Sequence, residues 1–294
     1  MIDRREAIAP SDDIATDMLM AHLIGRLSDE ASVRTIHRDE TVTFYRQAVE
    51  KVLHYMKSNL SHSLSLEELA EVAYISPYHF HRVFSEVTGI SPGKFLTALR
   101  IQKARDLVLQ TDAPIIEICY ESGYNSVSAF TTTFTELVGT APTRLRLLLN
   151  PDECPLRALV ATSVVKQQKV RREPSLRGRI VLNGKFQELI FVGVFPTGIP
   201  CRWPVAGGIF SNSNYYSIHG VPDGVFKVFG AAFGSSNVRS SDLLAPHPSF
   251  VARCRSSISV ENGVAKKTAD LVFRPSASID PPILTALSLL LPKR

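Results

Sequence analysis

The sequence has no apolar run long enough to cross a membrane. A bilayer-spanning helix needs about 20 consecutive apolar residues, and the longest candidate, residues 283–291, is about half that length. The first residues, Met1 to Glu6, are charged where a secretory signal would be apolar, which excludes a signal peptide at this position. The expectations that follow are no membrane partner and a cytoplasmic location.

Cysteine is also scarce. The four cysteines lie at least 35 residues apart, a spacing that gives neither a CxxC metal motif nor a disulfide framework. No metal and no other cofactor is therefore expected. With 294 residues, 45% of them hydrophobic and 21% charged, the chain is not of a disordered or collagen-like class. At roughly 150 residues per domain, the length favours two domains.

Acidic and basic residues are distributed unevenly along the chain. Residues 1–40 carry nine acidic and five basic side chains, residues 41–150 carry ten of each, and residues 151–294 carry 18 basic and nine acidic. The densest basic stretch, in residues 151–178, is interleaved with Gln, Pro and Gly, which predicts an exposed linker. Solvation and contact with DNA phosphates explain it equally well. The candidate phosphate contacts are Lys166, Lys169, Arg171 and Arg172.

An internal repeat organises residues 45–146. When Glu67–Pro92 is compared with Glu117–Pro142, nine of the 26 pairs are identical. Unrelated segments would share on the order of one or two at ordinary composition. The repeat therefore predicts that one structural unit occurs twice.

Each copy contains the signals of two short helices joined by a tight turn. In the first, Ser65 and Glu68 form a capping box, Pro77 suits the first position of a second helix, and Gly89 suits its end. In the second copy, the turn lies at Gly123–Ser126 and the second helix ends before Gly139. A longer helix beginning at Ser91-Pro92 joins the copies. The sequence thus predicts two helix-turn-helix units.

Helical projection separates the second helix of each copy into two faces. The apolar faces carry Phe80 and Phe84 in one copy and Phe130 and Phe134 in the other. A polar face on a single helix is more often simply solvated. Two polar helix faces in a repeated unit favour a role in contacting DNA bases. His79 and His81 diverge on a helix and have no third ligand nearby in sequence, so they are not a metal site. The polar face of the helix in the first copy carries Tyr78, His81, Arg82 and Ser85. The polar face of the helix in the second copy carries Ser128, Thr131, Thr132 and Thr135.

These residues resemble the DNA-binding region of the AraC/XylS family of bacterial transcription regulators. The matching segments are Leu66–Ala70, Ser76–Phe84, Thr88–Pro92, Leu99–Ala104 and Ile115–Pro142. The resemblance implies that both recognition helices enter the major groove of duplex DNA at promoters, with Tyr78, His81 and Arg82 contacting bases. In the second unit it assigns this role to Val127, Ser128, Thr131 and Thr132.

The chain departs from the family pattern in two respects. Thr132 stands where members commonly carry Arg, which weakens the expected base readout by the second unit. The companion domain follows the DNA-binding domain instead of preceding it. The resemblance still implies a transcription regulator, with an activator favoured, and as further partners RNA polymerase and a small-molecule effector of unknown identity.

Residues 179–294 show short β-rich runs separated by turn residues. Asn262-Gly263 predicts a hairpin, and Pro222-Asp223-Gly224 predicts another turn. The expected strands are Ile180–Leu182, Glu188–Phe195, Tyr215–Ile218, Val225–Phe233, Phe250–Val260 and Val264–Phe273. This pattern favours an antiparallel sandwich, and it is weakly similar to prealbumin-type or immunoglobulin-like modules.

No catalytic constellation stands out in this half. Cys201 superficially resembles the reactive cysteine of DNA-alkylation repair proteins, but Arg202 follows it where those proteins have His. Nothing in the spacing of His219, His247 and Asp223 makes a triad. The sequence therefore predicts a multidomain protein that is not an enzyme, with a repair protein or another DNA-targeted enzyme as the alternative. The expected layout is an acidic extension (1–40), an all-α DNA-binding domain with two helix-turn-helix units (41–150), a basic linker (151–178) and a smaller all-β, sandwich-like domain (179–294).

Overall fold

The computed structural model describes residues 41–147, 175–182, 188–211, 213–234, 247–254 and 256–285. The acidic extension and the candidate phosphate contacts Lys166, Lys169, Arg171 and Arg172 lie outside these residues. The chain divides into two compact units, Met1–Ala48 and Val49–Arg294, and both the helix-turn-helix repeat and the strands belong to the second. In the part of the chain that is described, no helix has the length and apolar character needed to span a bilayer.

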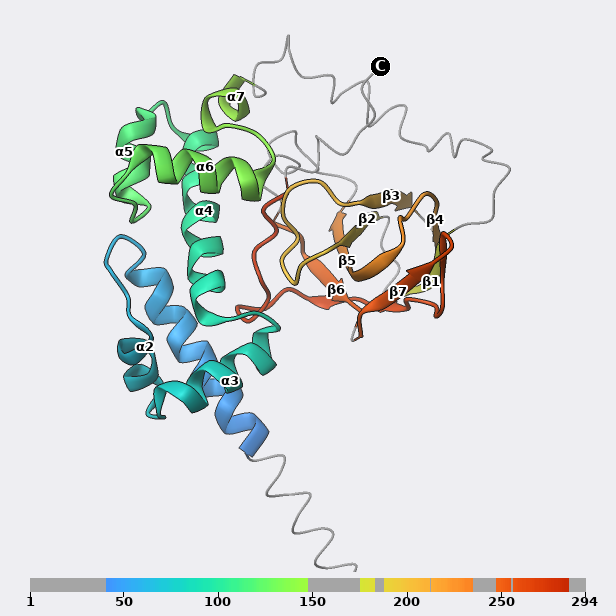
Figure 1. Ribbon diagram of the computed structural model, residues 1–294, viewed down its shortest axis with the longest axis horizontal. Helices are drawn as coiled ribbons and strands as arrows, with labels where there is room; N and C mark the ends of the chain where they lie inside the picture. Colours follow the sequence, from blue (N-terminus) through green and yellow to red (C-terminus); the bar gives the residue numbers. More distant parts are fainter. Residues whose placement is uncertain are drawn as a thin grey trace, which may run out of the picture. The chain divides into compact units, whose positions relative to one another are not determined.

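The first half of the described chain is helical, as the repeat predicted. Residues 41–58 form a helix. It is followed by α2 (Leu66–Ala73), α3 (Pro77–Thr88), α4 (Pro92–Gln110), α5 (Ile115–Glu121), α6 (Val127–Val138) and α7 (Pro142–Leu147). The long helix α4 runs between the α2–α3 pair and the α5–α6 pair (Figure 1). The structure therefore confirms two helix-turn-helix units joined by one long helix.

The residues that start and stop these helices are those that the sequence indicated. The side chain of Ser65 accepts from the backbone N–H of Glu68, and Ser126 accepts from Ala129. Gly89 and Gly139 end α3 and α6 with φ of 84° and 95°, a region that is accessible to glycine without strain. Ser76 holds the cap position of α3 but makes no capping hydrogen bond with its side chain.

The repeated phenylalanines build the same core in both units. The rings of Phe80 and Phe84 have centroids 5.5 Å apart, and those of Phe130 and Phe134 are 5.6 Å apart. All four side chains are fully buried. Because each pair sits on one side of its recognition helix, the opposite side of α3 and of α6 is turned outward.

One charged side chain is fully buried beside α4. Arg105 donates to the carbonyl oxygen of Ile283 at 2.6 Å and to the carboxylate of Asp106 at 3.1 Å. Asp106 is also 3.5 Å from Nε2 of His247. Burial would raise the pKa of the Asp106 carboxyl, but the His247 hydrogen bond and the Arg105 charge outweigh it and leave that pKa lowered. The buried guanidinium is therefore paired and hydrogen-bonded, as burial of a charge requires.

The second half of the described chain is β-rich. Its strands are β1 (Leu176–Val181), β2 (Glu188–Phe195), β3 (Ala206–Ser211), β4 (Tyr215–Ile218), β5 (Gly224–Gly234), β6 (Phe250–Arg253), β7 (Ile258–Glu261), β8 (Val264–Ala265), β9 (Leu271–Val272) and β10 (Arg274–Pro275). One sheet has the order β4-β1-β9. The other has the order β10-β6-β5-β2-β3, with β7 paired to β5 and β8 paired to β7.

The two sheets share one apolar core. Leu176 and Ile180 of β1 and Leu271 of β9 pack in the same buried cluster as Val192 of β2 and Val228 of β5. Tyr216 of β4 donates its hydroxyl to the carbonyl oxygen of Ala269. Burial, followed by the Cys254 and Asp270 charges, raises the pKa of that phenol.

Several strand predictions were correct and others need correction. The runs at β2 and β4 agree with their predicted bounds, and Asn262-Gly263 joins β7 to β8 with φ of 53° and 74°. The single strand expected over Phe250–Val260 is instead β6 and β7, and the one over Val264–Phe273 is β8 and β9. β1 begins at Leu176 instead of Ile180, and β3 and β10 were not predicted.

Candidate nucleic-acid interface

The outward face of α3 carries the polar side chains that the helical projection placed there. Tyr78 is 85% exposed, His81 and Arg82 are exposed, and Ser85 is half-buried. Phe80 lies on the opposite, fully buried side. Tyr78, His81 and Arg82 therefore lie on one accessible stripe of this 12-residue helix. Ser85 lies on the same side, but its hydroxyl oxygen is buried and has no hydrogen-bond partner among the described residues.

Arg82 has donors available for a ligand. Its guanidinium lies 3.5 Å from Nδ1 of His79, one turn earlier on the helix, and it forms no ion pair with any residue that the structure describes. A guanidinium in this state can donate two parallel hydrogen bonds to O6 and N7 of guanine. The Tyr78 ring, exposed at the start of the same helix, can pack against sugar or a thymine methyl group.

The outward face of α6 has a different chemistry. Ser128 and Thr132 are exposed, while Val127 and Thr131 are half-buried. The backbone oxygen of Thr131 accepts from the hydroxyl of Thr135 at 2.7 Å. The four predicted residues share one side of the helix, but none of them is charged, so this face has hydroxyl and methyl groups only.

Sequence reasoning missed two basic residues at equivalent positions of the repeat. Lys94 is the third residue of α4, Arg144 is the third residue of α7, and both are exposed. They are 50 residues apart, which is the offset of the repeat. Each follows the end of a recognition helix by a few residues, so each unit has one cation beside its outward helix. Extending the repeat comparison two residues beyond Pro92 and Pro142 would have found them.

The groups considered for catalysis do not form a site. Asp223 accepts from the backbone N–H of Gly263 in a turn, and His247 pairs with Asp106. Burial raises the pKa of the Cys201 thiol, against smaller opposing effects of the Thr197 hydroxyl and the Arg202 charge. Among the described residues, no group of three His, Cys, Asp or Glu side chains could hold a metal ion.

The family match to known proteins lies in the helical half of the chain. Residues 69–147 match the family model described as "Helix-turn-helix domain". The uncharacterized HTH-type transcriptional regulator YbfP of Bacillus subtilis is 31% identical over 106 residues, which are 36% of this chain and 36% of that protein. The bifunctional transcriptional activator/DNA repair enzyme AdaA of the same organism is 30% identical over 105 residues, 36% of this chain and 50% of that protein.

A third relative is matched over a longer stretch. The HTH-type transcriptional activator RhaS of Pectobacterium carotovorum is 27% identical over 138 residues, which are 47% of this chain and 48% of that protein. The chain thus spans half or less of the length of each of these three relatives. The shared stretches are 105 to 138 residues long.

Proposed function

We propose that this chain, whose residues 69–147 match a helix-turn-helix domain and resemble the AraC/XylS type, regulates transcription by binding specific sites in duplex DNA. The observation that carries the proposal is the duplicated unit, in which α3 and α6 each bury two phenylalanines and turn a polar face outward. Tyr78, His81, Arg82 and Ser85 of α3 and Val127, Ser128, Thr131 and Thr132 of α6 are the residues we assign to base contacts.

The length of α4 suits binding to successive turns of one DNA face. With 19 residues at about 1.5 Å each, the helix is about 28 Å long. One turn of B-DNA rises about 34 Å, and major-groove segments on one face recur at that spacing. A rigid helix of this length between the two units therefore supports simultaneous reading of two adjacent major-groove segments.

Phosphate contacts must come from few cations, because residues 41–150 carry ten basic and ten acidic side chains. Lys94 and Arg144 are exposed beside the recognition helices, and we assign them to the backbone flanking each segment. Lys166, Lys169, Arg171 and Arg172 of the predicted linker remain our candidates for further phosphate contacts. Neutralising phosphates supplies most of the sequence-independent affinity of such proteins.

The regulatory mode and the role of the β-rich half are also proposals. The similarity to RhaS, which is named an activator, supports activation, which would involve contact with RNA polymerase. The core shared by the two sheets supports a sandwich arrangement for the β-rich half, and a separate module of this kind suits the detection of a small-molecule effector. We also propose a cytoplasmic location, because the proposed activity is binding to promoter DNA.

Mapping the DNA that the protein occupies in cells tests the proposal. A regulator should be found at promoter regions that share one recurring sequence, and expression of the adjacent genes should fall when the protein is deleted, if it is an activator. The variant Arg82→Ala is the matched control, because its outward position leaves the core intact. Occupancy without a recurring sequence, equal for both proteins, would refute the proposal.

A further inference from the structure

Strand β2 is apolar on both faces. In β2, Ile190, Val192 and Val194 point into the core between the sheets. The alternate residues Phe191 and Phe195 point away from that core, yet they are only 5% and 4% exposed. A sheet with one solvated face would carry polar residues there, so this outer face must be covered.

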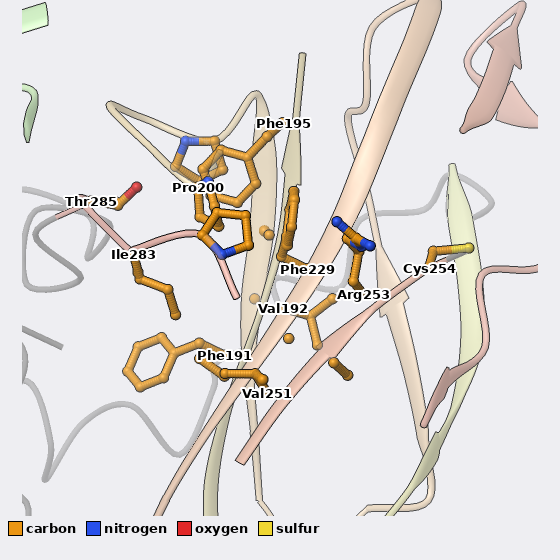
Figure 2. Close-up of a pocket in the computed structure, with 18 of the residues that line it drawn as sticks. Phe191, Val192, Phe195, Pro200, Phe229, Val251, Arg253, Cys254, Ile283 and Thr285 are labelled. Carbon is orange, nitrogen blue, oxygen red and sulfur yellow. The ribbon is translucent and has the colours of Figure 1, made fainter. Parts of the chain in front are cut away.

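The cover consists of two loops, and a cavity of about 880 Å³ lies between them and the sheet. Pro200 and Trp203 come from the loop after β2, and Ile283 comes from the segment after β10. Figure 2 shows Phe191, Phe195, Phe229, Pro200 and Ile283 around this cavity. Its volume lies within the range of about 300–1,000 Å³ that small-molecule sites occupy.

The polar groups of the wall are not all satisfied. Arg274 is paired with Asp280, and Asp270 with Arg179. Arg253, in contrast, forms no ion pair with a described residue. The hydroxyl of Thr285 is buried and has no hydrogen-bond partner among the described residues, and the residue is only 1% exposed. An unpaired hydroxyl costs free energy when buried, so a ligand oxygen here would be favoured.

Arg253 is in a position to meet a bound anion. It is the register partner of Phe229 on the neighbouring strand, so both project to the same face of the sheet, and Figure 2 shows them side by side at the cavity. A guanidinium beside an aromatic wall is suited to a molecule that is apolar at one end and anionic at the other.

We propose that this cavity binds a small aromatic molecule with one anionic group, such as an aryl carboxylate. The rings of Phe191, Phe195, Phe229 and Trp203 hold the aromatic body, Arg253 takes the anion, and Thr285 donates to an oxygen of the ligand. The regulatory consequence rests on the function proposed above, whereas binding itself does not.

The same guanidinium contacts the end of a recognition helix. Arg253 donates to the backbone oxygen of Thr88, the last residue of α3, at 2.9 Å. The loop that carries Trp203 makes a similar contact, since the N–H of Arg202 donates to the backbone oxygen of Leu137 near the end of α6. An anion that draws Arg253 toward the cavity would therefore weaken its bond to α3, which couples occupancy of the cavity to DNA binding.

Trp203 is the single tryptophan of the chain and lines the cavity, so its fluorescence reports occupancy directly. We expect 2-naphthoate to change the emission saturably and to bind about tenfold more tightly than neutral 2-naphthamide, because only the former forms a charge-assisted bond. Equal affinity for the two probes, or no saturable change with either, overturns the proposal.

Variants of the full chain test the assignment of residues. Arg253→Gln should remove the tenfold preference for 2-naphthoate, whereas Arg177→Gln, the same change at an exposed residue of β1 outside the cavity wall, should keep it. Ala231→Leu and Val251→Phe, which add volume to the wall, should weaken both probes at least tenfold. Circular dichroism identifies any variant that fails to fold. A folded Arg253→Gln that retains the preference overturns the role of Arg253.

The coupling has its own measurement. At saturating 2-naphthoate, the affinity of the wild-type chain for a specific DNA site should change several-fold, and that of Arg253→Gln should not. If the fluorescence of Trp203 responds to 2-naphthoate but the DNA affinity is unchanged, the proposed coupling is wrong and the proposed binding site stands. If the protein has no specific DNA site, the proposed function fails, and the fluorescence titration still decides whether the cavity binds its ligand.

Discussion

At the scale of single residues, Arg82 is the side chain that should contribute most to base discrimination. It is exposed on α3 and free of ion pairs within the described chain, whereas Thr132 of α6 offers only a hydroxyl and a methyl group. A bidentate contact from Arg to guanine is worth roughly 1–3 kcal/mol. Arg82→Ala should therefore weaken binding by that amount and relax specificity in one half of the site.

Titration of labelled duplex with each variant gives the comparison. Thr132→Ala, a substitution of similar exposure on α6, serves as the control and should cost clearly less. A greater loss of affinity from Thr132→Ala than from Arg82→Ala would reverse the order of importance of the two units.

Cys201 decides between the regulator and the repair protein. Burial raises the pKa of its thiol, and Arg202 follows it instead of a histidine, so little of the nucleophilic thiolate is present near neutral pH. We expect no alkyl transfer when the protein is incubated with methylated DNA and its intact mass is measured. A stoichiometric mass gain that disappears in Cys201→Ser would establish the repair activity.

At the scale of the elements, the turn of the second unit depends on a glycine. Gly123 has φ of +83°, and a Cβ there would collide with the backbone oxygen of Leu60. Gly123→Ala should lower the free energy of unfolding by more than the roughly 1–2 kcal/mol that the left-handed conformation costs an L-residue. Urea denaturation of both proteins measures the difference.

Gly220 provides the control for this prediction. Its φ is +71°, but a Cβ there would meet nothing within 4 Å. Gly220→Ala should therefore show the conformational cost without the collision. Equal losses of stability for the two variants would show that the close approach of Leu60 does not constrain the turn.

The helical half could be predicted because its signals are local. Ser65, Pro77, Gly89 and their counterparts act within a few residues, and the 50-residue offset reveals both units at once. The outward positions of Tyr78 and Arg82 follow from the helical period alone. Lys94 and Arg144 were missed although the same repeat offset relates them. The hydrogen bond from the hydroxyl of Tyr55 to the carboxylate of Glu68 could not be predicted, because it joins residues on two different helices.

The β-rich half was predicted less well, for reasons that can be traced to particular residues. β3 contains Gly207 and Gly208, and glycine lowers the strand signal. In β2, and in β5 from Val228 onward, both faces are apolar, because a core lies on one side and the cavity on the other. The alternation that marks a half-exposed strand is absent there. The cavity itself arises from loops and strands far apart in sequence, which no local pattern reveals.

At the scale of the whole molecule, the basic linker tests how the protein gains affinity for phosphates. Lys166, Lys169, Arg171 and Arg172 lie outside the described residues, and their role is inferred from charge alone. Replacing all four with Gln should make log affinity less steeply dependent on log salt, by about 0.9 for each phosphate that the variant no longer neutralises. An unchanged slope would mean that these residues are merely solvated.

The most direct test of the central claim, that the repeat reads DNA sequence with two helices, is a selection from random duplexes with the full chain. We predict one enriched site with two conserved segments about 10–10.5 base pairs apart. Arg82→Ala should reduce the sequence preference in only one of these segments. Recovery of sequences without any enriched motif, or of a motif that Arg82→Ala leaves unchanged, would contradict it.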